Sequence, residues 1–97
     1  MRNEQIVEWD PEKEKINLRK HGISFDEAVT VFGDTDAVVL VDETHAEIED
    51  RFAIIGYSRY ERILLVAYTY RVANTLRLIS ARRVTKAERR LYEEDRR

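Results

Sequence analysis

The chain has no cysteine among its 97 residues, which excludes disulfide bonds and thiolate chemistry. Its longest apolar run, residues 63–68, is far shorter than the roughly 20 residues that a membrane-spanning helix needs. The first residues lack the apolar block of a secretory signal. These absences predict a cytoplasmic protein with no membrane contact.

Proline and glycine are also scarce, with one proline and three glycines. Because there is no Ser-rich or Gly-rich linker, we expect residues 1–97 to form a single domain, in keeping with the usual ~100–150 residues of a domain. Nucleotide-binding glycine motifs and the Gly-x-Ser-x-Gly motif of serine hydrolases are missing. Two distant histidines without cysteine give no metal-ligand spacing, so we expect no metal and no cofactor.

Charge is distributed unevenly along the chain. Residues 1–50 carry 5 basic and 14 acidic side chains, whereas residues 51–97 carry 12 basic and 5 acidic ones. Eleven of those 12 cations are arginines, the side chain that suits bidentate phosphate binding and stacking on bases. This bias favours RNA or another phosphate partner, although ion pairs between the two halves explain the same composition.

The first half predicts a strand and two helices. A short strand over 5–9 precedes Asp10-Pro11, a helix start at which the aspartate caps free N–H groups. That helix is expected to run to about Lys20 and to end at Gly22. Ser24 and Glu27 form a capping box for the second helix, in which the glutamate reaches back to the serine.

The second half predicts an antiparallel sheet and a last helix. Apolar runs predict strands over 37–41, 51–57, 62–70 and 75–83. Short turns join the last three in an antiparallel meander, and an acidic connection over 42–50 precedes them. Thr85 and Glu88 form another capping box, which opens a charged helix through Tyr92. The fold class is therefore α+β, with an N-terminal strand and two helices packed on an antiparallel meander, and a C-terminal helix.

The last predicted strand carries several cations. Strict alternation places Arg77, Ile79, Ala81 and Arg83 on one face and Arg82 on the other. These arginines either form salt bridges with the acidic half or gather around a phosphate. His21, at a helix end, is either a cation favoured by the helix dipole or an acid–base group.

Two blocks of sequence resemble the BrnT family of bacterial toxins. Residues 9–25 carry Trp-Asp-Pro, Lys13, Asn17 and Lys-His-Gly-Ile-Ser-Phe, and residues 78–83 read Leu-Ile-Ser-Ala-Arg-Arg. The likeness also includes Ala28, Val31-Phe32, Asp34, Glu49-x-Arg51-Phe52, Gly56, Glu88 and Tyr92. It covers nearly the whole chain in the same order, and matches least between Asp34 and Glu49.

The resemblance implies a toxin of a type II toxin–antitoxin system with a RelE-like fold. Such toxins cut RNA without a metal, and so halt translation and growth. The implied partner is a BrnA-like antitoxin, which blocks the toxin and represses the shared operon through a ribbon-helix-helix segment. Operator DNA is then contacted only through the antitoxin.

RNA supplies its own nucleophile, the 2′-hydroxyl, so cations and one acid–base group suffice for cleavage. We expect side chains of three kinds at the site. The catalytic candidates are His21, Arg51, Arg82 and Lys13. The RNA-binding candidates are Lys20, Arg77, Arg83 and Tyr92. Glu49 and Glu88 are expected to orient the arginines.

An alternative is a non-catalytic binding module that represses transcription together with its partner. The two hypotheses differ in where the cations lie. Convergence of Arg51, Arg82 and a histidine or lysine in one cleft favours the enzyme. Scattered arginines, each paired with a carboxylate, favour the module.

Overall fold

The computed structural model describes residues 5–42, 51–70 and 74–95. The elements in chain order are β1 (Ile6–Glu8), α1 (Pro11–His21), α2 (Phe25–Val29), the 3-10 helix η1 (Thr30–Gly33), β2 (Val38–Asp42), β3 (Arg51–Tyr57), β4 (Ile63–Tyr70), β5 (Thr75–Arg83) and α3 (Lys86–Asp95). The predicted order of helices and strands is confirmed.

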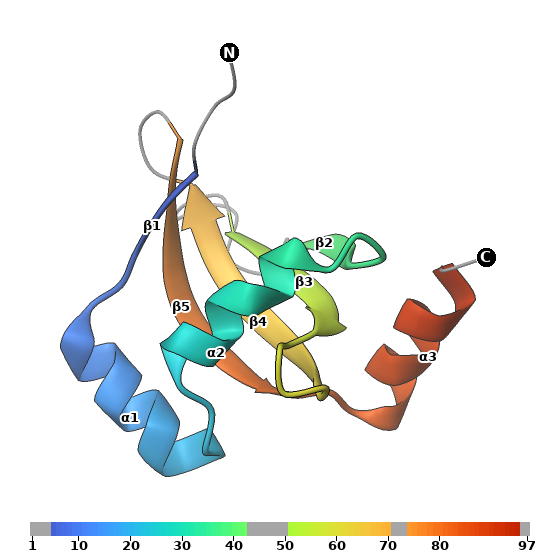
Figure 1. Cartoon of the computed structure of the whole chain (residues 1–97), viewed down its shortest axis with the longest axis horizontal. Helices are drawn as coiled ribbons and strands as arrows, with labels where there is room; N and C mark the ends of the chain where they lie inside the picture. Colours follow the sequence, from blue (N-terminus) through green and yellow to red (C-terminus); the bar gives the residue numbers. More distant parts are fainter. Residues whose placement is uncertain (1–4, 43–50, 71–73, 96–97) are drawn as a thin grey trace.

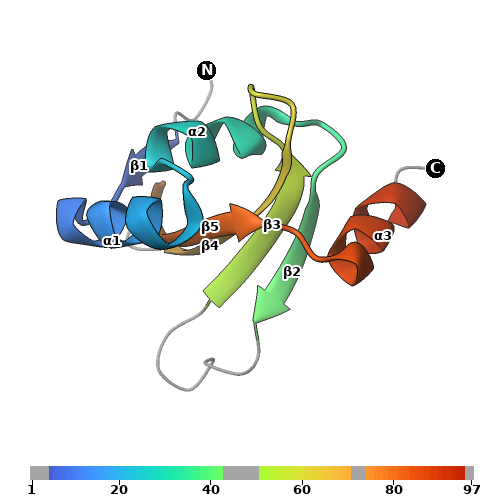
Figure 2. The ribbon, with the colours of Figure 1, turned by 90° about the horizontal axis from the view of Figure 1, so that it is seen from below.

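One five-stranded sheet forms the centre, in the order β1-β5-β4-β3-β2. The strands β3, β4 and β5 are antiparallel neighbours, which confirms the predicted meander. The strand β2 adds to it in antiparallel at β3, and β1 pairs with β5 in parallel. In Figure 2 the strands β2 and β3 lie between α2 and α3. The two sheet faces are therefore covered by different helices.

Local capping residues begin and end the helices. The Asp10 carboxylate accepts a hydrogen bond from the Glu12 N–H at 2.9 Å, and Gly22 ends α1 in the left-handed conformation with φ of 72°. Glycine adopts that conformation without the steric cost of a side chain. The Thr85–Glu88 box is formed in both directions, at 3.2 Å and 2.9 Å. These predicted caps are confirmed.

The box at Ser24 is only half formed. Its hydroxyl accepts from the Glu27 N–H at 3.1 Å, but the Glu27 side chain turns away from Ser24. The carboxylate is buried instead, where it accepts hydrogen bonds from Arg62 and Ser58. The prediction that Glu27 reaches back was wrong because a buried charge is stabilised more by a guanidinium partner than by a backbone N–H.

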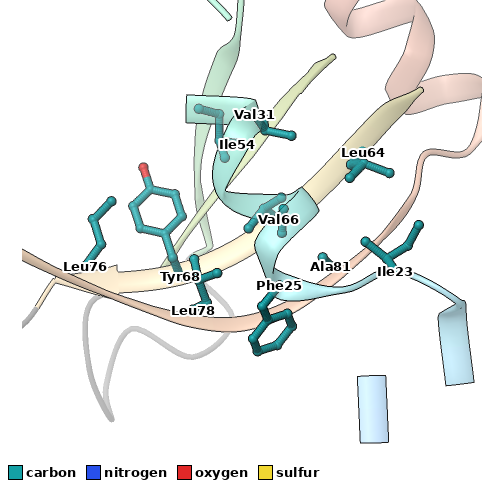
Figure 3. Packing of buried hydrophobic residues seen from close by; sticks show 11 residues of the cluster. Ile23, Phe25, Val31, Ile54, Leu64, Val66, Tyr68, Leu76, Leu78 and Ala81 are labelled. Carbon is teal, nitrogen blue, oxygen red and sulfur yellow. The ribbon is translucent and has the colours of Figure 1, made fainter. Parts of the chain in front are cut away.

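The main core lies between α2 with η1 and one sheet face, which we call the covered face (Figures 1 and 3). Phe25, Ala28 and Val31 are fully buried there. They meet side chains from three neighbouring strands: Ile54, Leu64, Val66, Tyr68, Leu76, Leu78 and Ala81. Trp9 and Phe32 pack against this cluster.

A β-bulge changes the faces of β5. Tyr68 pairs with Leu78, whereas the preceding Ala67 pairs with Ser80, so Ile79 is an extra residue. Leu76, Leu78, Ala81 and Arg83 consequently share the covered face. The strict alternation predicted for this strand was wrong, because the inserted residue reverses the pattern after Leu78.

A smaller apolar cluster attaches α3 to the opposite sheet face. Tyr92 of α3 is buried with Ile55 and Ile63, and Val38 and Leu40 pack around them. The Tyr92 hydroxyl donates to the Asp34 carboxylate at 2.8 Å. This contact fixes α3 beside the β2 end of the sheet.

Candidate functional site

The sheet face opposite α2 carries three of the predicted arginines, and we call it the arginine face. Arg77 on β5 pairs with Thr69 on β4, which pairs with Arg51 on β3. Paired residues in a sheet point to the same side, so Arg51 and Arg77 share this face. Arg82 lies there as well, opposite Leu65.

Small side chains separate the two ends of the arginine face. Ser80, Ala67 and Ala53 form a row across β5, β4 and β3. This row lies between Arg82 at one end and the row of Arg77 and Arg51 at the other. Only small side chains therefore project from the middle of the arginine face, whereas arginine side chains project from its two ends.

A hollow of about 220 Å³ lies where α1 meets β5. It is lined by Lys13, Ile16, Asn17, Lys20 and His21 of α1 and by Ile79 and Ser80 of β5. We call it the α1 hollow. Lys13, Ile16, Asn17 and Lys20 are three or four residues apart, which places them along one side of the helix. Three predicted site residues, His21, Lys13 and Lys20, thus come together.

Asn17 fixes α1 against the edge of β5. Its side-chain amide donates to the Ala81 carbonyl at 2.9 Å, and its oxygen accepts from the Ala81 N–H at 3.0 Å. The same amide donates to the Ile23 carbonyl at 2.9 Å. Asn17 is buried, so these bonds satisfy backbone groups that water does not reach. They set the position of the α1 hollow relative to Ser80.

The hollow and the arginine face adjoin at Ser80. Its side chain lines the hollow and also lies in the row between Arg77 and Arg82. Lys13, Lys20 and His21 are exposed and form no ion pair with any described residue. The cations of α1 and the arginines Arg77 and Arg82 of β5 therefore lie on either side of Ser80.

Arg82 is held by Glu88, the residue predicted to orient it. Two parallel hydrogen bonds of 2.9 and 2.8 Å join the guanidinium to the carboxylate. The hydrogen bond from Arg82 lowers the pKa of Glu88, and the same contact raises the pKa of Arg82. Because Glu88 also caps α3, the direction of Arg82 is coupled to the start of that helix.

Arg77 is paired as well. Its guanidinium donates to the Glu8 carboxylate of β1 at 2.9 Å, and both side chains are partly exposed. A partly exposed pair contributes little to stability, about 0–1 kcal/mol, and its partners exchange readily. The predicted cations are therefore of two kinds, the unpaired ones of α1 and the paired arginines of β5.

Three predicted residues do not join this surface. Arg83 lies on the covered face and lines a second hollow near α3. Tyr92 is 2% exposed, so its ring is not accessible to a base, and the expectation that it binds RNA is corrected. Glu49 lies outside the described residues.

Sequence reasoning missed the part of Ser80 and Ile79 in the hollow. The bulge that places Ser80 beside α1 leaves no pattern in the neighbouring sequence from which it could be predicted. Asn17 stood in the sequence only as part of the block that resembles the BrnT family, and its lysine neighbours did not predict its burial.

The described part of the chain offers neither a metal site nor a membrane-spanning helix. Within the described ranges, no three histidine or acidic side chains gather in a way that could hold a metal ion. Of the helices in residues 5–42, 51–70 and 74–95, none is long and apolar enough to cross a membrane.

Comparison with known proteins identifies the family. The family model described as the ribonuclease toxin BrnT of type II toxin–antitoxin systems matches residues 9–88. The crystal structure of the Brucella abortus ribonuclease toxin BrnT is similar, with a TM-score of 0.67 and 22% identity over 86% of this chain and 100% of that one. The comparison with curated proteins gave no match. Because the family model covers most of the sequence, the chain belongs to the BrnT ribonuclease toxins of type II toxin–antitoxin systems.

Proposed function

We propose that this toxin is a metal-independent endoribonuclease whose active site is the α1 hollow with the adjoining arginine face. In this mechanism the RNA 2′-oxygen attacks the neighbouring phosphorus while its proton passes to a base. The bond from phosphorus to the 5′-oxygen then breaks, and the leaving oxygen takes up a proton. The products are a cyclic phosphate and a 5′-hydroxyl end.

One observation carries the proposal: His21, Lys13 and Lys20 share a hollow with Ser80 of the strand that bears Arg77 and Arg82. His21 is the candidate for proton transfer, a step that is typically worth 10²–10⁴-fold. The lysines and Arg82 stabilise the charge that develops on the phosphate. Arg51 and Arg77, at the far end of the arginine face, bind the flanking backbone.

The cellular consequence follows from RNA cleavage. Cutting RNA halts translation and growth, so the chain requires an antitoxin partner. We assign that role to a BrnA-like antitoxin with a ribbon-helix-helix segment. The antitoxin blocks the toxin surface and connects it indirectly to operator DNA.

The direct test is to incubate the purified toxin with RNA in the presence and absence of EDTA. Because cations of the chain supply the charge stabilisation, cleavage should proceed equally in both, with cyclic phosphate ends. Loss of cleavage on chelation, restored by a divalent ion, would contradict metal independence. Expression with and without the genomic neighbour, followed by growth and bulk RNA integrity, tests the antitoxin assignment.

A second candidate, a non-catalytic repressor module, is favoured by the pairing of Arg82 with Glu88 and of Arg77 with Glu8. Arg82→Ala separates the two. The enzyme loses RNA cleavage and growth arrest but keeps antitoxin binding. A module without catalysis shows no cleavage in either form and retains operator binding with its partner.

A further inference from the structure

A second hollow of about 280 Å³ lies at the C-terminal end of β5. It is lined by Glu61, Arg62, Ile63, Arg83, Val84 and Arg89, none of which lines the α1 hollow. The lining comes from three places in the fold: the start of β4 with the turn before it, the end of β5, and α3. We call it the arginine hollow.

The three arginines of this hollow are held to different degrees. Arg62 donates hydrogen bonds of 2.8 and 2.6 Å to the buried carboxylate of Glu27, which fixes its direction, and 30% of its side chain remains exposed. Arg89 contacts Glu93 only across an exposed 3.5 Å pair one helical turn away. Such a pair is weak and gives way to a stronger anion.

Arg83 is the side chain whose charge is least compensated. It is exposed, and among the described residues its guanidinium has no hydrogen bond and no ion pair. Its charge nevertheless contributes, after the stronger effects of Arg62 and Ser58, to lowering the pKa of Glu27. Among the described residues of the lining, Glu61 supplies the only carboxylate against three arginines, so positive charge predominates there.

We propose that the arginine hollow binds a phosphate group, and that in this toxin it is a backbone phosphate of the RNA strand. Guanidinium groups from separate elements match the oxygens of a phosphate, which accept paired N–H donors. The RNA assignment rests on the proposed ribonuclease function. The binding of phosphate itself rests only on the charge and shape of the hollow.

The position of the hollow suits an extended substrate. Ser80 and Arg83 are three residues apart on β5, about 10 Å along the strand, but their side chains lie on opposite faces of the sheet. A substrate that reaches both hollows therefore passes around the C-terminal end of β5, which a single strand of several nucleotides can do. One phosphate would then lie in the arginine hollow while another is at the α1 hollow, so affinity should rise with substrate length.

The test measures binding without cleavage, with 2′-O-methyl oligonucleotides that lack the nucleophile. The double variant Arg83→Gln/Arg89→Gln removes two cations of the hollow but spares Arg62, which Glu27 requires. The matched control Arg59→Gln/Arg90→Gln removes two exposed arginines that lie outside the lining. Both variants therefore have the same net charge, and thermal unfolding by circular dichroism checks that both fold.

The hollow variant should bind a 12-mer roughly tenfold or more weakly than the control does, because phosphate loses charge-assisted hydrogen bonds. The slope of log affinity against log salt should be shallower by about 0.7 for each backbone phosphate that the variant no longer binds. Glu61→Gln should change affinity in the opposite direction. Equal affinity of the two double variants for the 12-mer would overturn the RNA assignment.

A second measurement distinguishes the source of the phosphate. Inorganic phosphate is titrated into the wild-type protein and both double variants, and amide chemical shifts around Arg83 and Arg89 are followed. Shifts that disappear only in the hollow variant support a phosphate site, and no shifts in the wild type combined with equal RNA affinities overturn it. Because no cleavage is measured, failure of the proposed ribonuclease activity would not affect either result.

Discussion

Two cationic regions of this toxin differ in how their charges are satisfied. Beneath α2, Arg62 donates two hydrogen bonds to Glu27, whose side chain is 2% exposed. Beside α1, Lys13, Lys20 and His21 are exposed and have no ion pair within the described part of the chain. A buried charge must be paired to be tolerated, whereas an exposed one is stabilised by water and stays available to a ligand.

The difference teaches how one small domain uses similar side chains for stability and for chemistry. The pairing of Glu27 with Arg62 connects α2 to the β3–β4 hairpin across 35 positions of sequence. Lys13, Lys20 and His21 form no ion pair with another described residue, so removing one of them leaves no buried charge without a partner. Substitutions in the two regions should therefore separate loss of activity from loss of stability.

The largest effect is expected at the α1 hollow. His21→Ala should reduce the rate of RNA cleavage by about 10²–10⁴-fold, because it removes the proposed proton-transfer group. Its unfolding free energy should remain close to that of the wild type, since the side chain is exposed. The control is Arg19→Ala, an exposed cation of the same helix outside the hollow. A His21→Ala rate within tenfold of wild type would place proton transfer elsewhere.

Glu27→Gln should give the largest loss of stability. Removing one charge of a buried pair typically costs 3–5 kcal/mol, and we expect about 3 kcal/mol because Arg62 is partly exposed. Urea unfolding measures the change. Glu12→Gln breaks the exposed pair with Lys15 and should cost less than about 1 kcal/mol. Similar losses in the two variants would mean that burial does not distinguish these pairs.

Asn17→Ala tests whether stability and RNA cleavage depend on the same contact, since this buried side chain holds α1 against β5. The variant leaves the polar groups of Ala81 and Ile23 without their partner, which should cost about 2 kcal/mol. Cleavage by the remaining folded protein should also fall, because the hollow shifts relative to Ser80. Unfolding and cleavage are measured on the same sample, and normal cleavage by the folded fraction would separate Asn17 from the site.

The smallest effect is a dependence of stability on pH. The hydrogen bond from Arg62 lowers the pKa of Glu27 below its ordinary value of 4.5. The stabilisation is therefore complete above pH 4.5 and is lost as the pH falls through the lower pKa of the folded protein. Urea unfolding from about pH 6 to about pH 3 should show a steeper decline for the wild type than for Glu27→Gln. If the wild type and Glu27→Gln lost stability in parallel as the pH falls, the pH dependence could not be assigned to the Glu27–Arg62 pair.

The sequence predicted local structure best where capping residues and apolar patterns agree. Asp10-Pro11, Gly22 and the Thr85–Glu88 box begin or end helices where they were expected to. These signals act over a few residues, so no distant contact is needed to interpret them. The pairing of Glu88 with Arg82 could be predicted for the same reason, since only six positions of sequence separate the two residues.

Prediction failed where a distant partner competed with a local one. The Glu27 side chain was predicted to bond the Ser24 N–H of its own capping box. It instead accepts hydrogen bonds from Arg62, which lies 35 positions away. Tyr92 was expected to face RNA, yet it is buried by Ile55 and Ile63 and donates to Asp34. Neither partner is visible in the sequence around these residues.

The sequence by itself determined the elements, their order, the caps and the supply of cations, because each depends on neighbouring residues and on composition. The tertiary structure alone decided which cations meet. Because of the bulge at Ile79, Arg82 lies on the arginine face and Arg83 on the covered face, the reverse of what strict alternation predicts. Asn17 holds α1 so that His21 and the two lysines lie beside Ser80. Both depend on pairing between segments far apart in the chain, which no local pattern encodes.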